Sequence, residues 1–218
     1  MTTKEVITKC KRRIKFYSQR LFQLYDCYWD WRIAGRVLER TVPAYNEETL
    51  RSMPTKYHTL YEMFRDSKFT AEDRFIDVGC GKGRVFAYLL KRHFPGSITG
   101  VELNPEVAAV AQAWTKRYPQ VKVVVGNAFD MNYDDYTVMY LFRPFKRRFV
   151  IQLVQLLESQ LTHPLRLYFL TDQFSGDYID QRPEWHLVRR GSVYRKYGLF
   201  LYVCPQRYSV WEYVPQKC

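Results

Sequence analysis

The sequence predicts an α/β fold built on a mostly parallel sheet, because short apolar runs alternate with helical patterns from about residue 71 onward. Two runs carry this prediction. Phe75–Val78 is a short apolar run followed by three glycines at every second position, and Val121–Val125 is a continuous β-branched run of the kind found in strands buried on both faces. Strands that alternate with helices form right-handed βαβ units, so we expect them to lie parallel.

We expect two parts, a helical N-terminal extension over residues 1–70 and a sheet-bearing domain over residues 71–218. The extension is predicted to be helical at residues 4–40 and 57–65, with a turn at Val42–Asn46. The apolar stripe of the first helix fits packing over the mouth of a site, or contact with a membrane surface. Strands are predicted at 74–78, 97–103, 121–125, 137–142 and 165–171, helices at 83–93, 104–118 and 146–161, and four short C-terminal strands at Trp185–Val188, Ser192–Arg195, Leu199–Val203 and Tyr208–Tyr213.

A glycine-rich loop follows the first predicted strand and opens a helix. Such a loop lets the backbone approach a ligand closely and presents free N–H groups at the positive end of a helix. The spacing does not fit a dinucleotide fingerprint, because Arg84 stands where G-x-G-x-x-G needs its third glycine. No Gly-Lys-Ser/Thr follows either, which argues against a phosphate-binding loop. The loop therefore predicts a nucleotide-like ligand of another kind.

The order Asp77-x-Gly79-x-Gly81-x-Gly83 resembles motif I of the class I S-adenosylmethionine-dependent methyltransferases. This resemblance implies a Rossmann-like fold with seven strands and an antiparallel C-terminal edge. It also implies S-adenosyl-L-methionine (AdoMet) as cofactor, whose sulfonium and ammonium cations suit an acid beside the glycines. From motif I we predict these cofactor-binding residues: Asp77, Val78, Gly79, Cys80, Gly81, Gly83 and Arg84.

Other motifs of this family match further along the chain. Glu102 ends the second predicted strand, where an acid accepts hydrogen bonds from ribose hydroxyls. The resemblance places the adenine at Asn127–Phe129, and it places a Pro-Thr-x-Tyr segment, here Pro54–Tyr57, across the methionine end of the cofactor. The remaining predicted cofactor-binding residues are therefore Glu102, Leu103, Asn127, Ala128, Phe129, Phe142 and Thr55.

The acceptor site departs from the family pattern at Arg143-Pro144-Phe145. Amino-group methyltransferases of this family carry Asn or Asp before the proline, and its oxygen holds the acceptor nitrogen. Arginine only donates hydrogen bonds, so this chain is predicted to favour an anionic acceptor such as a carboxylate, a phenolate or a phosphate-bearing substrate, unless Arg143 pairs with a local acid. Arg143 and Tyr57 are the predicted catalytic residues. Asp172 and His186 are further candidates for a general base, if the acceptor needs one.

Net charge and cysteine content limit the kinds of partner and the cellular compartment that we expect. The formal net charge is +12, and residues 1–20 carry seven basic side chains against Glu5 alone, so nucleic acid, an acidic protein or an anionic membrane surface could each be a partner. Five scattered cysteines without C-x-x-C spacing predict a reducing compartment, which we take to be the cytoplasm, and no metal site. The sequence has no apolar run long enough to cross a membrane.

The leading hypothesis is an AdoMet-dependent methyltransferase whose acceptor is a small molecule, a protein side chain or RNA. One alternative is a non-catalytic, basic nucleic-acid-binding protein on the same scaffold, and an intact glycine triplet argues against it. The other is a dehydrogenase, which Arg84 disfavours.

Overall fold

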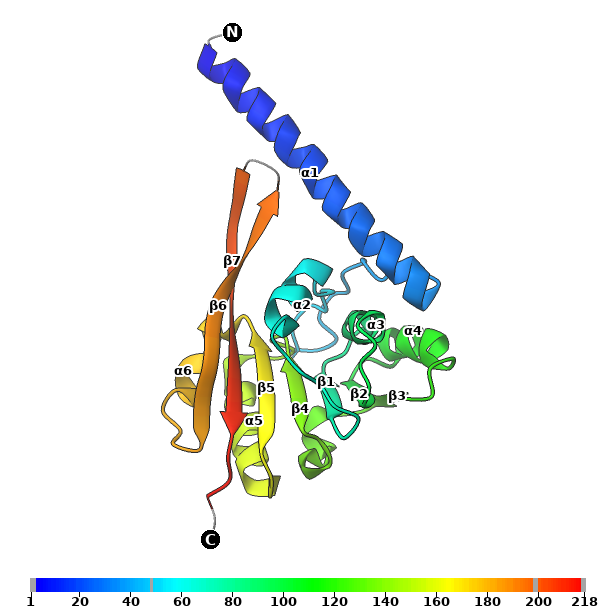
Figure 1. Ribbon diagram of the computed structural model, residues 1–218, viewed down its shortest axis with the longest axis vertical. Helices are drawn as coiled ribbons and strands as arrows, with labels where there is room; N and C mark the ends of the chain where they lie inside the picture. The colour runs from blue at the N-terminus through cyan, green and yellow to red at the C-terminus, as the bar shows by residue number, and fades with distance from the viewer. Residues whose placement is uncertain (1–2, 48, 198–199, 217–218) are drawn as a thin grey trace.

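The computed structural model describes residues 3–47, 49–197 and 200–216, and it describes only the backbone of residues 3–4, 11–21, 194–197 and 200–205. Seven strands form one sheet in the order β3-β2-β1-β4-β5-β7-β6 (Figure 1). The first five in sequence are parallel, β7 is antiparallel to β5, and β6 is antiparallel to β7. The predicted α/β fold with an antiparallel C-terminal edge is confirmed. The strands are β1 (Arg74–Val78), β2 (Ser97–Glu102), β3 (Val121–Val125), β4 (Val138–Leu141), β5 (Leu165–Leu170), β6 (Trp185–Tyr197) and β7 (Phe200–Tyr213).

Helices cover both faces of the sheet. Alternation along β1 sends Phe75 to one face and Ile76 to the other, so that two apolar cores form. The first core joins helices α2, α3 and α4, and the second joins α5 and α6. The helices are α1 (Thr3–Ala34), α2 (Tyr57–Phe64), α3 (Arg84–Lys91), α4 (Pro105–Thr115), α5 (Arg147–Gln160) and α6 (Gly176–Ile179).

Local sequence explains where several helices begin and end. Asn104 caps α4 because its side chain accepts hydrogen bonds from the N–H groups of Glu106 and Val107. The first helix is shorter than predicted, since it ends at Ala34 and not near residue 40. Gly35 adopts a φ of 67° and donates its N–H to the carbonyl of Trp31, which is the conformation that terminates a helix.

The C-terminal part forms two long strands, so the prediction of four short ones was wrong. β6 and β7 pair along most of their length, with register shifts at Leu187/Arg189 and Val193/Arg195. Pro205 has no N–H to donate to the β-ladder. It lies between Tyr202 and Gln206, which pair on either side of the second register shift, so β7 continues past it. The predicted strand Leu199–Val203 begins at a residue outside the described part of the chain.

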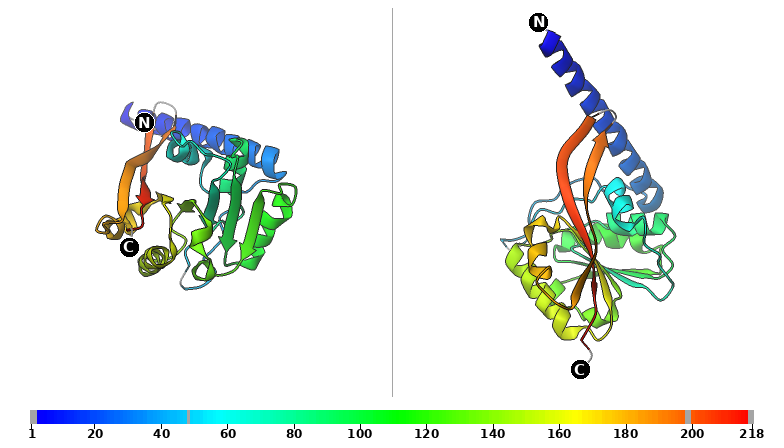
Figure 2. Two further views of the ribbon diagram at one scale, coloured as in Figure 1. Left: turned by 60° about the horizontal axis from the view of Figure 1, so that its bottom comes forward. Right: turned by 60° about the vertical axis from the view of Figure 1, so that its left-hand side comes forward.

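α1 and the β6–β7 hairpin extend beyond the rest of the molecule on the same side (Figures 1 and 2). Of the described residues of β7, those paired with β5 are Tyr208–Tyr213, so the earlier residues of β7 lie past the carboxyl end of β5. This is the edge of the sheet at which all five parallel strands end. Among the residues that the structure describes, no helix combines the length and apolar character needed to cross a membrane.

Candidate active site

A cavity of about 550 Å³ opens at the carboxyl edge of the sheet. Its size lies in the range of ligand pockets, and open α/β sheets bind ligands at this edge. On the sheet, one half of its wall comes from residues at or after the ends of β1, β2 and β3, including Gly79, Glu102 and Asn127. The other half comes from residues that follow β4 and β5 and from β7, including Arg143, Phe174 and Gln206, and the segment from Leu38 to Thr55 adds a further part of the wall.

The glycine loop follows β1 with a backbone that side chains would obstruct. Gly79, Gly81 and Gly83 have φ values of 75°, 57° and 84°, a region that other residues rarely adopt. A Cβ atom on Gly79 would lie 2.6 Å from Cβ of Pro144, and one on Gly81 would lie 2.8 Å from Oγ of Ser52. The loop therefore needs glycine both for its conformation and for the close approach of its neighbours.

Glu102 connects the end of β2 to the glycine loop. Its Oε2 accepts a hydrogen bond of 2.9 Å from the N–H of Gly81, and its Oε1 accepts one of 2.9 Å from the N–H of Asn104. Burial raises the pKa of this carboxyl above its ordinary value, while these backbone donors act in the opposite direction. The side chain is thus held in place at the position where the family motif expects a ribose.

Asp77 is the most deeply buried acid of the site. It is 2% exposed, and its Oδ2 atom has no hydrogen-bond partner. Burial, followed by the nearby charge of Glu102, raises the pKa of Asp77 well above its ordinary value. A buried carboxylate without a partner on the wall of a cavity is suited to a cationic ligand, and the ammonium group of AdoMet is such a cation.

Most of the predicted cofactor-binding residues meet on the wall of this cavity. Those on the wall are Thr55, Asp77, Gly79, Cys80, Gly81, Arg84, Glu102, Leu103, Asn127, Ala128 and Phe142. Val78, Gly83 and Phe129 lie outside it. Val78 packs in the second core, where its neighbours are side chains of the opposite face of the sheet, and Phe129 stacks near Phe145 and Phe149.

Tyr57, predicted to be catalytic, does not reach the cavity. It is 2% exposed at the start of α2 and packs against the rings of Tyr25 and Tyr88. The helix that begins at this residue turns the side chain into the core between α1 and α3. Because the residue lies behind the wall, the structure gives it no contact with the reacting atoms, and the assignment is corrected to a packing role.

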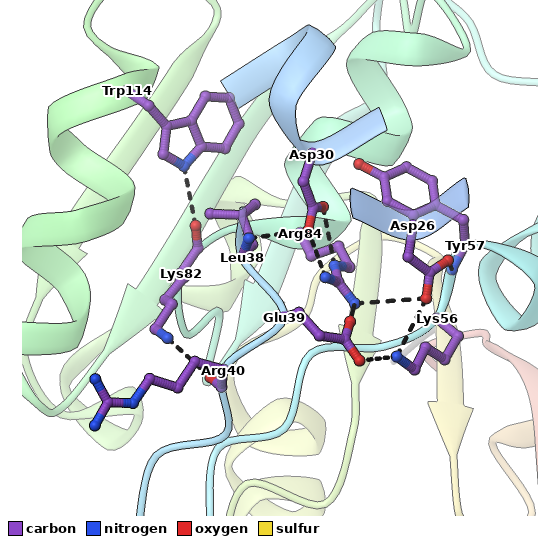
Figure 3. Close-up of polar contacts among 10 residues, drawn as sticks. All are labelled: Asp26, Asp30, Leu38, Glu39, Arg40, Lys56, Tyr57, Lys82, Arg84 and Trp114. Carbon is purple, nitrogen blue, oxygen red and sulfur yellow. Dashed lines mark hydrogen bonds and ion pairs between the residues drawn. The ribbon is translucent and has the colours of Figure 1, made fainter. Parts of the chain in front are cut away.

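Arg84, on the wall of the cavity, belongs to a buried ionic network that sequence reasoning missed (Figure 3). Its Nε and Nη2 atoms donate to the two carboxylate oxygens of Asp30 at 3.0 and 2.5 Å, and its Nη1 donates to Glu39 at 2.7 Å. Lys56 pairs with Glu39 and, at 3.3 Å, with Asp26. Burial raises the pKa of Asp30, and although burial also acts on Glu39, hydrogen bonds from Lys56 and Arg84 bring the pKa of Glu39 below its ordinary value.

The network attaches two segments from the N-terminal part to the glycine loop. Asp30 also accepts the N–H of Leu38 at 2.9 Å, and Lys82, inside the loop, donates to the carbonyl of Arg40 at 2.8 Å (Figure 3). The segment from Leu38 to Thr55 in turn supplies much of the cavity wall. Thr55 is held from the sheet side by a 2.8 Å hydrogen bond with the hydroxyl of Tyr140 on β4. Pro43 and Pro54 in this segment were the sequence signals for an ordered, non-helical connection.

Arg143 lies in the half of the cavity beyond β4. It has a φ of 39°, and its guanidinium lies 4.0 Å from the ring centroid of Phe174. Within the described part of the chain it forms no ion pair or hydrogen bond, so pairing with a local acid is excluded there. Phe174 and Gln206, which share this half of the wall, were not predicted from the sequence.

The two further candidates for a general base lie away from the cavity. Asp172 is fully buried, and its oxygens accept hydrogen bonds from Arg207 at 2.7 Å and Arg190 at 3.2 Å. His186 is exposed on β6 and is not on the wall. Of the described residues on the wall, only Asp77 and Glu102 carry carboxylates, and both face the cofactor half.

Comparison with known proteins agrees with this geometry. Residues 75–157 match the profile of a family described as a methyltransferase domain. These residues therefore form a methyltransferase domain, and the chain has the fold of the class I methyltransferases. Its cofactor is S-adenosylmethionine. No curated protein matches the chain by sequence.

Solved methyltransferase structures share the fold at low sequence identity. A methyltransferase from Pyrococcus furiosus is 14% identical, with a TM-score of 0.59 over 91% of this chain and 98% of the other. An RNA methyltransferase from Salinibacter ruber in complex with S-adenosyl-L-homocysteine is 19% identical, with a TM-score of 0.55 over 76% of this chain and 96% of the other. A putative rRNA-methylase from Clostridium thermocellum is 13% identical, with a TM-score of 0.53 over 72% and 95% of the two chains.

The residues of this methyltransferase fit the cofactor. The unpartnered Oδ2 of Asp77 would suit the ammonium group, Glu102 at the end of β2 would hold the ribose, and Asn127 after β3 would contact the adenine. When bound, AdoMet supplies an activated methyl group on a sulfonium. The protein's part is then to orient an acceptor beside that methyl group and to exclude water.

Proposed function

We propose that this methyltransferase acts on an anionic acceptor and that Arg143 binds the acceptor's negative charge. The observation that carries the proposal is the guanidinium of Arg143 on the cavity wall, stacked on Phe174 and without an acidic partner in the described residues. An arginine held in this way offers fixed donors for a carboxylate or a phosphate.

The charge of the cavity supports an anionic acceptor. Besides Arg143, its wall carries Arg40, Arg51 and Lys82 against the two carboxylates Asp77 and Glu102, while Arg84 on the same wall is paired with Asp30 and Glu39. Burial, followed by repulsion from Arg40, Arg36 and Arg84, lowers the pKa of Lys82. Both carboxylates lie on the side of the glycine loop, which leaves the half beyond β4 with arginine alone.

Such an acceptor needs little acid–base chemistry from the protein. An anionic nucleophile such as a carboxylate or phenolate carries no proton on its attacking oxygen, so no base is required. Arg143 would hold the acceptor so that its nucleophile lies in line with the bond from sulfur to methyl, and orientation of this kind supplies several kcal/mol. This fits a wall that carries no free base in the half beyond β4.

RNA is the anionic acceptor class that a second observation favours. The chain has a formal net charge of +12, and two of the similar structures are titled RNA methyltransferase and putative rRNA-methylase. Phosphate groups of RNA would give Arg143, Arg40 and Arg51 their counter-charges, while the attacking atom would belong to a base or a ribose, and it would need a base wherever it carries a proton. Small-molecule carboxylates and protein side chains are the competing acceptors.

The test uses AdoMet labelled on its methyl group, with cell extract separated into RNA, protein and metabolites as acceptor. Label should enter one fraction, and Arg143→Gln should reduce incorporation at least about tenfold, the effect of losing a charged hydrogen bond. Calorimetric titration should find the AdoMet affinity of Arg143→Gln unchanged, while Glu102→Ala should lose it.

Other results would contradict the proposal in distinct ways. Incorporation of label by Arg143→Gln at the wild-type level would contradict the proposal that Arg143 binds an anionic acceptor, but not the methyltransferase activity. Salt-sensitive RNA binding without any incorporation, and without dependence on AdoMet, would favour the non-catalytic alternative.

A further inference from the structure

The outward face of α1 carries a heptad pattern that the methyltransferase site does not use. From Ile7 to Trp31, apolar residues recur at strict alternating spacings of three and four. Eight positions share this spacing without interruption, which is the pattern of a coiled-coil seam. The eight residues, here called the α1 seam, are Ile7, Cys10, Ile14, Tyr17, Leu21, Leu24, Tyr28 and Trp31.

The body of the protein covers a different face of α1. The residues of α1 buried against α3 and the segment after α1 include Asp26, Asp30 and Ala34. Asp26 and Asp30 occupy heptad positions opposite the seam, and Ala34 follows the last seam residue. Seam residues in the same turns remain exposed, with Leu24 at 63%, Tyr28 at 53% and Trp31 at 62%. Ile7 is 48% exposed near the start of the helix.

The seam is long enough to hold a partner helix, and its described side chains, Ile7, Cys10, Leu24, Tyr28 and Trp31, are exposed. From Ile7 to Trp31 it spans about 36 Å at 1.5 Å per residue. Most of that length lies in the part of α1 that extends beyond the domain, beside the hairpin (Figures 1 and 2). A large exposed apolar stripe on a helix that leaves the domain is typical of an interaction surface.

The charges beside the seam specify the partner. The positions that flank a coiled-coil seam hold Lys11, Arg13, Arg20 and Arg32, and none of the flanking positions from 6 to 32 holds an acid. Pairing two copies of α1 would therefore bring like charges together in either orientation. A helix with glutamate or aspartate at its flanking positions would be attracted.

We propose that the α1 seam docks an acidic amphipathic helix of another protein in coiled-coil fashion. The proposal is independent of the acceptor. It concerns a binding surface on the side of the molecule at which the active-site cavity opens. The regular spacing and the basic flanking positions favour a helix, while a membrane surface, which the exposed Val6 and Tyr25 beside the seam would also suit, is distinguished by the test below.

A synthetic four-heptad peptide with Ile and Leu in its seam and Glu at the flanking positions is the probe. Calorimetry with the full-length protein should show micromolar binding that weakens as salt is raised. A matched peptide with Lys at the flanking positions should bind at least about tenfold more weakly. Leu24→Asp should abolish binding, while Gln23→Asp, the same new charge on an adjacent exposed residue off the seam, should leave it unchanged.

A charge exchange gives a second test. Arg20→Glu with Arg32→Glu should reverse the preference, so that the Lys peptide binds more tightly than the Glu peptide. Circular dichroism and AdoMet titration of each variant show that the fold is intact.

Three results would overturn the proposal. The first is failure of the wild-type protein to bind the Glu peptide. In the second, light scattering finds a dimer that Leu24→Asp dissociates, which makes the occupant a second copy. In the third, the protein binds phosphatidylserine vesicles through Leu24 while neither peptide binds, which makes the occupant a membrane.

Discussion

Arg84, the first residue of α3, binds both carboxylate oxygens of Asp30 near the end of α1, 54 positions earlier in the chain. The contact is almost completely buried, with Arg84 at 2% and Asp30 at 0% side-chain exposure. It joins the N-terminal helix to the glycine loop at the point where α3 begins. The wall of the cofactor cavity and the N-terminal helix are thus one structural unit.

Removing Arg84 should destabilise the protein strongly. Among the described residues, Arg84→Ala leaves Asp30 without a cationic partner and leaves Asp26 and Glu39 with Lys56 alone, and breaking a buried pair from one side costs about 3–5 kcal/mol. Urea denaturation followed by circular dichroism measures the free energy of unfolding. Arg84→Ala combined with Asp30→Asn should recover part of the loss, because one uncompensated charge is removed. A loss below about 1 kcal/mol would show that the network contributes little.

Asp77→Asn should stabilise the protein in the absence of AdoMet and weaken its binding. The folded-state pKa of Asp77 is raised, so the folded state prefers the protonated carboxyl, and stability is lost as pH rises above the ordinary value of 3.8. Near neutral pH the variant should therefore melt at a higher temperature, by about 2–4 °C for each kcal/mol gained. Its advantage should shrink as pH falls toward 4.

Binding supplies the control for Asp77. The affinity of the wild-type protein for AdoMet should rise with pH as the carboxylate forms, while the affinity of Asp77→Asn should be low and flat. Thermal melts and calorimetry over the same pH series check both statements. An Asn variant with wild-type affinity would show that this acid does not face the cation.

Gly79→Ala should destabilise the glycine loop. The residue would adopt a φ of 75°, and its Cβ would lie 2.6 Å from Cβ of Pro144, whose backbone is held by the N–H of Leu50. Left-handed conformations of this kind cost about 1–3 kcal/mol before the clash is counted. Gly126→Ala is the matched control, because its Cβ would meet only Val124 at 3.9 Å. Equal melting temperatures of the two variants would contradict the role of Pro144.

Phe174→Ala should reduce acceptor turnover without changing AdoMet affinity. The ring lies 4.0 Å from the guanidinium of Arg143, and an exposed contact of this type contributes about 0.5–1 kcal/mol, which corresponds to about a two- to fivefold loss in kcat/KM. Phe174→Tyr keeps the aromatic face and should retain most of the rate. Initial rates with the acceptor that the labelling experiment identifies provide the measurement. An equal loss of rate in Phe174→Tyr and Phe174→Ala would exclude stacking as the cause.

The sequence alone determined the features that depend on local pattern. The glycines follow directly after the run Phe75–Val78. Glu102 is the last residue of the next strand. Parallel strands bring their carboxyl ends to one edge. The α/β order, the cofactor class and the part of the cavity wall formed by the glycine loop, Glu102 and Asn127 could therefore be predicted without the structure. The same reasoning identified Arg143 as a departure from the family pattern.

Tertiary structure decided the relationships between distant residues. Nothing in the spacing of Asp26, Asp30 and Glu39 indicates that all three surround Arg84, because the contact forms only when α1 and the segment after it pack on α3. The turn at the start of α2 sends Tyr57 into the core, although its motif had placed it at the ligand. Packing likewise leaves Arg143 without an acid and seats it on Phe174. Local propensity sets which elements form, while burial and charge pairing across the chain decide which side chains meet.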